Sequence, residues 1–102
     1  MKIEDTKNLV LLQKEFPKLV WYKDTHNTYK GVSDLITIEL CYDFIEYQQL
    51  WWVNVYFTNQ DLSDRFAIDL LFECQLWNCL EMAIDGTKEF IKEASKAIVD
   101  LI

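Results

Sequence analysis

The sequence predicts an α+β fold: an N-terminal helix, a mostly antiparallel sheet of about four strands, and one or two C-terminal helices packed on one sheet face. Two patterns carry this prediction. Apolar residues recur with helical spacing at both ends of the chain and alternate with polar residues through its middle. A third observation is compositional, since 51% of the residues are hydrophobic and only three are glycine or proline. This composition excludes a disordered chain, and we expect a single domain over residues 1–102.

The first element is a helix that ends before Pro17. Asp5 or Thr6 can cap its start, because a short polar side chain there accepts a bond from a free backbone N–H group. Its apolar face is Leu9, Leu12 and Phe16. A short strand follows over 19–22, and the polar residues 24–33 predict a loop.

Two strands of opposite parity come next. Apolar side chains occupy the even positions of 35–45 and the odd positions of 50–58. This flip predicts a hairpin that turns near Tyr47 and Gln48, although the turn lacks the usual Asn-Gly pair. On the core side we expect Leu40 to oppose Val55. The pairs expected on the other side are Asp43 with Trp52, Cys41 with Asn54 and Glu39 with Tyr56.

The parity flips again over 65–74, which predicts a further strand. Its apolar positions are Phe66, Ile68, Leu70, Phe72 and Cys74. In this register Val55 opposes Ile68 in the core, and Asn54 opposes Asp69 on the other face.

Helical spacing resumes after residue 74. Residues 75–85 predict a helix, with an extra strand over 76–84 as the alternative. Gly86 is suited to end that helix, and Thr87 is suited to cap a last one that runs to the C-terminus.

The net charge of −7 is concentrated in the middle of the chain. Residues 1–30 carry +2, residues 31–85 carry −9, and the remainder is neutral. Such a field repels nucleic acid and attracts basic surfaces. Three cysteines favour a reducing compartment, and no apolar run is long enough for a membrane span or a secretory signal. We therefore expect a soluble cytoplasmic protein.

Recognised catalytic motifs are missing from the sequence. His26 stands alone in a polar segment, and Cys41 has no basic neighbour in the sequence. The carboxylates Glu39, Asp43 and Asp69 share a face, but a solvated sheet face explains them more simply than a metal site. We expect neither a cofactor nor a metal, and no enzymatic activity.

What remains is a surface for a protein partner. The expected partner-binding residues share one sheet face: Glu39, Asp43, Trp52, Asn54, Tyr56, Asp69 and Glu73. Exposed Trp and Tyr side chains serve as interface anchors, and carboxylates around them suit a basic partner. The alternative is that the N-terminal helix or a second subunit covers these aromatic residues.

The leading hypothesis is an inhibitor or decoy that occupies the basic site of a nucleic-acid-handling protein. In general character the chain resembles the small acidic inhibitors of phages and mobile elements, and the immunity proteins that neutralise nuclease toxins. This resemblance is one of composition and assigns no role to any residue. The alternative is a non-catalytic subunit or scaffold that forms a homo-oligomer through its aromatic surface. A carboxylate-based enzyme is the least favoured reading.

Overall fold

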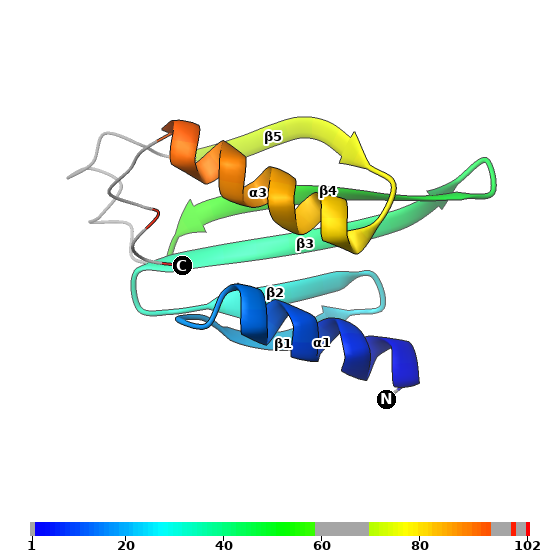
Figure 1. Cartoon of the computed structure of the whole chain (residues 1–102), viewed down its shortest axis with the longest axis horizontal. Helices are drawn as coiled ribbons and strands as arrows, with labels where there is room; N and C mark the ends of the chain where they lie inside the picture. Colours follow the sequence, from blue (N-terminus) through cyan, green and yellow to red (C-terminus); the bar gives the residue numbers. More distant parts are fainter. Residues whose placement is uncertain (1, 59–69, 95–98, 100–101) are drawn as a thin grey trace.

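The computed structural model describes residues 2–58, 70–94, 99 and 102. Helix α1 (Ile3–Glu15) precedes a five-stranded sheet, and helix α3 (Leu80–Ala94) follows it (Figure 1). The strands are β1 (Val20–Thr25), β2 (Thr28–Val32), β3 (Ile36–Ile45), β4 (Gln48–Phe57) and β5 (Leu70–Trp77). The predicted α+β class is confirmed, with five strands in place of about four.

The sheet is an antiparallel meander in the order β1-β2-β3-β4-β5. Both helices lie on the same face of it, α1 over β1 and β2, and α3 over β4 and β5 (Figure 1). The core lies between these layers. It joins Leu12 and Phe16 from the α1 segment, Ile38 and Val53 from the sheet, and Ile91 from α3.

Helix α1 begins earlier than predicted. Lys2 is the N-cap residue and no side chain caps the helix, so Asp5 and Thr6 lie inside the first turns. Asp5 instead bonds to groups of the sheet, as described below. The predicted apolar face is confirmed at Leu12 and at Phe16, the residue that follows the helix; both are buried.

Residues 24–33 form a hairpin and not the predicted loop. β1 runs to Thr25 and β2 begins at Thr28. The sequence hides β2 because its core-facing positions are Tyr29 and Gly31. Gly31 lies opposite Trp21, and a Cβ on Gly31 would be 2.5 Å from the Trp21 indole ring. That indole therefore supplies the apolar surface which a larger side chain supplies in other strands.

The β3–β4 hairpin has the predicted faces but a different register. Leu40 opposes Val53 and not Val55, a slip of two residues. A slip of two preserves which face each side chain occupies, so alternation alone does not detect it. The turn fixes the register: it is the two-residue pair Glu46-Tyr47, with φ of 52° and 67°. Two positive φ angles are typical of a tight type I′ hairpin turn.

Strand β5 pairs differently from the prediction. Val55 opposes Leu71 and not Ile68, which lies outside the described residues together with the rest of 59–69. Leu70, expected on the core parity, pairs with Tyr56. The β4–β5 ladder also contains an irregularity between Trp51 and Val53, which an alternation pattern does not reveal.

The C-terminal boundaries shift as well. β5 continues to Trp77, so residues 75–77 belong to a strand and the predicted helix over 75–85 is wrong at its start. The alternative of a strand over 76–84 is also wrong, because α3 begins at Leu80. α3 then passes through Gly86 and Thr87, which neither end nor cap a helix. Within the described part of the chain, no helix is long and apolar enough to cross a bilayer.

Candidate functional site

The predicted partner-binding residues of β3 and β4 do share one face, on the side of the sheet away from α1 and α3. Glu39 pairs with Asn54, Cys41 with Trp52, and Asp43 with Leu50. The side chains of Glu39, Trp52, Asn54 and Tyr56 are partly exposed, and that of Asp43 is exposed. These five residues, Glu39, Asp43, Trp52, Asn54 and Tyr56, are called the open sheet face below.

The other two predicted residues are not brought to this cluster. Asp69 lies outside the described residues. Glu73 belongs to β5, and its backbone pairs with Val53, a buried core position of β4. The register sets Phe72, and not Glu73, opposite Asn54.

A lysine that was not predicted as part of the site borders this face. Lys30 of β2 pairs with Glu39 across the sheet. A hydrogen bond with Tyr56 holds the pKa of Lys30 above its usual value. Burial, followed by the hydrogen bond with Glu39, raises the pKa of the Tyr56 phenol. The ammonium, phenol and carboxylate form one bonded chain, so the predicted acidic rim is partly neutralised. Lys30 was missed because residues 24–33 were predicted to be a loop.

Cys41 is on this face but is not an accessible thiol. It is buried, and its Sγ accepts a hydrogen bond from the Thr28 hydroxyl at 3.6 Å. Burial raises the pKa of the Cys41 thiol, which disfavours the reactive thiolate. Cys41 therefore lies on the outer side of the sheet, as its predicted pairing implied, but its thiol is covered and not activated.

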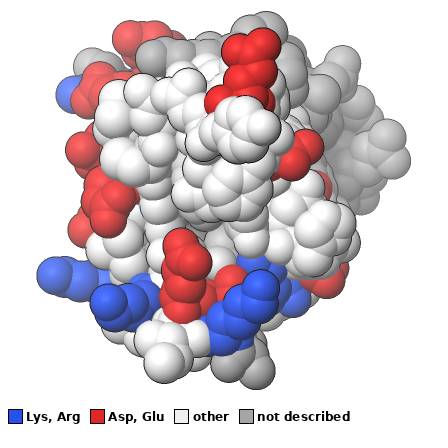
Figure 2. All heavy atoms as spheres, turned by 90° about the vertical axis from the view of Figure 1, so that its right-hand side faces the viewer, with Lys and Arg blue, Asp and Glu red and all other residues white. Residues whose placement is uncertain are grey.

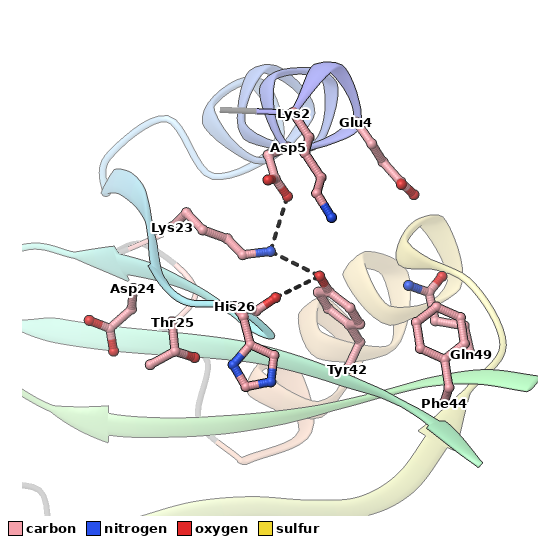
Figure 3. Close-up of a pocket in the computed structure, with 10 residues that line it drawn as sticks. All are labelled: Lys2, Glu4, Asp5, Lys23, Asp24, Thr25, His26, Tyr42, Phe44 and Gln49. Atoms are coloured by element: carbon pink, nitrogen blue, oxygen red, sulfur yellow. Dashed lines mark hydrogen bonds and ion pairs between the residues drawn. The ribbon is translucent and has the colours of Figure 1, made fainter.

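A pocket of about 660 Å³ opens on the opposite side of the sheet, at the end where α1 begins. Figure 3 shows it between the start of α1, the β1–β2 turn and the β3–β4 hairpin. Its lining residues are Lys2, Glu4, Asp5, Lys23, Asp24, Thr25, His26, Tyr42, Phe44 and Gln49. Sequence spacing gave no signal for this pocket, because its residues come from four separate segments.

The inner wall of the pocket is a bonded network around Lys23. Its Nζ lies 3.0 Å from Asp5 Oδ1 and 3.0 Å from the Tyr42 hydroxyl, and 4.2 Å above the centre of the Tyr29 ring. The Tyr29 hydroxyl donates to Asp5 at 2.6 Å. Figure 3 shows Asp5, Lys23 and Tyr42 meeting in this way. The network joins α1 to three strands of the sheet.

The charges in this network stabilise one another. Hydrogen bonds from Tyr29 and Lys23 lower the pKa of Asp5. Burial alone lowers the pKa of Lys23, but its bonds with Tyr42 and Asp5 outweigh that effect and raise it. Both groups stay ionised at neutral pH, which suits a structural ion pair better than a proton-transfer site.

His26 lies in the β1–β2 turn at the mouth of the pocket. Its carbonyl oxygen accepts a hydrogen bond from the Tyr42 hydroxyl at 2.8 Å, and its side chain is exposed. Across residues 2–58 and 70–94, no group of three His, Cys, Asp or Glu side chains is placed to hold a metal ion. What the pocket can offer a ligand is contact with its charged side chains and with the rings of Tyr42 and Phe44.

No protein-family model matches this chain, and neither the curated proteins nor the solved structures yield a match.

Proposed function

We propose that this protein is a protein-binding module that acts in the cytoplasm as an inhibitor or decoy, occupying the basic site of a nucleic-acid-handling protein. The observation that carries the proposal is the open sheet face. It joins two aromatic side chains, Trp52 and Tyr56, to the carboxylates of Glu39 and Asp43. Both helices lie on the other side of the sheet (Figure 1).

The chemistry of this face suits a basic partner. Trp and Tyr bury a large area at low entropic cost, and they are the side chains most often found as interface anchors. Arginine stacks on aromatic rings and also pairs with carboxylates. One arginine of a partner can therefore contact an aromatic ring such as Trp52 and a carboxylate such as Asp43 together. The Lys30 ammonium lies beside Glu39, which leaves Asp43 as the exposed carboxylate for charge pairing.

The charge of the chain supports the same class of target. A net charge of −7 opposes direct binding to nucleic acid, whose phosphates carry the same sign. The same charge accelerates association with a protein surface that has evolved to bind phosphates.

A pull-down from the native host, followed by mass spectrometry, identifies the partner. Surface plasmon resonance with the purified partner then tests the open sheet face. Trp52→Ala should accelerate dissociation and weaken binding by about 2 kcal/mol, because buried anchors act mainly on the off-rate. Paired Glu39→Gln and Asp43→Asn changes should slow association and flatten its dependence on salt.

Matched controls use exposed residues away from this face. Met82→Ala and Glu93→Gln, both on α3, should leave the rates unchanged. Normal binding by folded Trp52→Ala and by the double carboxylate variant would refute the proposed face. A partner that binds the same at all salt concentrations would refute charge steering.

A further inference from the structure

The β3–β4 hairpin presents apolar side chains at one end of the molecule. Phe44 is 67% exposed, Ile45 is 47% exposed and Tyr47 is fully exposed. Phe44 continues the core-facing positions of β3 and lines the pocket beside the start of α1, yet its side chain stays exposed. The exposed carboxylates of Asp43 and Glu46 flank these side chains. Residues 44–47 are called the hairpin end below.

The turn of this hairpin contains two residues whose backbone conformation is unfavourable for their side chains. Glu46 and Tyr47 both have positive φ angles, which Asn and Gly adopt more readily. A bulky residue in this conformation stores backbone strain, and such strain is concentrated at functional positions. A fully exposed aromatic ring in a strained turn indicates a surface role, because it contributes no packing within its own chain.

A second apolar surface lies on the outer side of α1. Ile3 is 80% exposed and Val10 is 67% exposed, and seven residues return a helix to the same face. Lys7 lies between them, and the three residues with Thr6 line a shallow hollow of about 370 Å³. Ile3, Lys7 and Val10 are called the α1 stripe below. It is apolar and basic, whereas the hairpin end is apolar and acidic.

The hairpin end and the start of the α1 stripe are at the same end of the molecule. The hairpin and the start of α1 both point to the right in Figure 1. Figure 2 faces this end: lysines gather along the lower side with carboxylates among them, and a broad uncharged area lies above them with further carboxylates around it. Most lysines of the end face are therefore on its lower side, and its upper side carries mostly carboxylates.

We propose that this end face is the interface of a two-fold dimer, in which the hairpin end of each copy packs on the α1 stripe of the other. A two-fold axis turns the acidic side of one copy onto the basic side of its partner, so each contact is made twice. Phe44 and Tyr47 would cover Ile3 and Val10, and Glu46 would pair with Lys7. The open sheet face takes no part, so this inference does not depend on the proposed inhibitor function.

A second copy fits these observations better than an unrelated protein. Both halves of the contact are present on one chain, with opposite charge and with apolar area on each. Two acidic hairpin ends facing one another would repel, which excludes a contact between like surfaces and selects the crossed arrangement.

Sedimentation equilibrium of the intact chain, from low micromolar to submillimolar concentration, tests the proposal. We expect a dimer whose dissociation constant rises with salt. Tyr47→Asn should weaken the dimer by about tenfold or more while leaving the fold intact, because Asn accepts the left-handed conformation and removes only the ring. Phe44→Ser should weaken it by a similar factor. Val20→Ser, a change at another exposed apolar residue on β1, should have no effect.

Charge reversal supplies a stricter test. Lys7→Glu and Glu46→Lys should each weaken the dimer, and the two together should restore it, because the reversed pair still attracts across the interface. The matched reversals Lys92→Glu and Glu93→Lys, on exposed positions of α3, should change nothing. Circular dichroism checks that each variant is folded.

Several outcomes overturn the proposal. A monomer at every concentration does so, and so does a dimer that the hairpin and α1 variants leave unchanged. Masses that grow beyond the dimer would indicate an open, non-closing contact in place of the two-fold one. None of these results bears on the binding variants of the open sheet face, so the two proposals fail separately.

Discussion

Two tryptophans lie directly against two glycines, and these contacts set how closely β1 packs with β2 and β5 packs with α3. Trp21 covers Gly31 within the β1–β2 hairpin, and Trp77 covers Gly86 between β5 and α3. Gly86 in mid-helix is unfavourable by propensity, because glycine loses more backbone freedom than other residues. Its place is explained by the indole ring that occupies the space of a Cβ.

Gly86→Ala tests this explanation. Alanine favours a helix by about 1 kcal/mol, whereas overpacking costs about 1–3 kcal/mol. A Cβ at position 86 would lie 2.4 Å from the Trp77 ring, so we expect overpacking to dominate and unfolding free energy in urea to fall by roughly 1 kcal/mol. The same change in a Trp77→Leu background should cost less. A gain in stability from Gly86→Ala alone would contradict the packing role.

Asp5 gives a pH-dependent prediction. Its pKa is lowered in the folded protein by the hydrogen bonds from Tyr29 and Lys23, so its stabilising effect is complete above the unfolded pKa of about 4 and is lost as the pH falls through the folded value. Asp5→Asn should therefore cost about 1–3 kcal/mol at pH 7, and the difference from wild type should shrink below about pH 4.

Urea denaturation at a series of pH values measures this difference. Asp34→Asn, at an exposed carboxylate, is the control and should change the free energy of unfolding by less than about 0.5 kcal/mol. A loss in Asp5→Asn that stays constant down to the lowest pH would show that charge is not the cause.

At the scale of elements, the free edge of β1 is closed by a side chain of α1. The Gln13 amide donates from Nε2 to the Leu19 carbonyl at 2.8 Å, and its Oε1 accepts from the Trp21 N–H at 3.3 Å. This carboxamide imitates one unit of a neighbouring strand. Covering an edge in this way reduces its tendency to pair with other chains.

Gln13→Ala should free both backbone groups. We expect a loss of about 1 kcal/mol in stability and faster hydrogen exchange at the Trp21 amide. Gln13→Glu keeps an acceptor for Trp21 but loses the donor to Leu19, so its Trp21 exchange should stay slow. If exchange at Trp21 is unchanged in Gln13→Ala, the bond does not protect the edge.

The alternation of apolar and polar residues predicted which face of the sheet each side chain occupies better than it predicted which residues pair across strands. Alternation placed Leu40, Val53 and Val55 in the core correctly, because burial of one face is visible in every second residue. It misplaced their register, since Glu46 and Tyr47 form a two-residue turn without the residues that normally mark one. Propensity misled at Gly86, where a contact distant in sequence overrides the local preference.

The same limit applies to the candidate sites. The open sheet face was predicted in part because its residues alternate along two adjacent strands, where sequence spacing implies proximity. The pocket around Lys23 was not predicted, because Asp5, Lys23 and Tyr42 come together only when α1, β1 and β3 pack. Lys30 was missed for a simpler reason, since the strand that carries it has a glycine at a core-facing position.

At the scale of the whole molecule, two ion pairs among the described residues hold α1, and they differ in character. Lys23 and Asp5 join it to the sheet at 3.0 Å with side chains 14% and 17% exposed, and Lys88 and Glu15 join it to α3 at 2.6 Å with side chains 37% and 33% exposed. Solvent screens the second pair, and exposed pairs contribute about 0–1 kcal/mol. The sheet, more than α3, should therefore position α1.

The last prediction compares these two attachments directly. Lys88→Met should reduce stability by less than about 1 kcal/mol, and salt should erase that loss, because an exposed pair is screened within a Debye length of about 8 Å. Lys23→Met should cost roughly 2 kcal/mol or more at any salt concentration, because it leaves the Asp5 carboxylate partly buried beside Tyr29 without its cation. Urea is the denaturant of choice, since it leaves ionic strength unchanged. Equal losses in the two variants would mean that α3 holds α1 as firmly as the sheet does. The end face would then depend on both helices together, because the Ile3 and Lys7 side chains can oppose the hairpin only while α1 keeps its place.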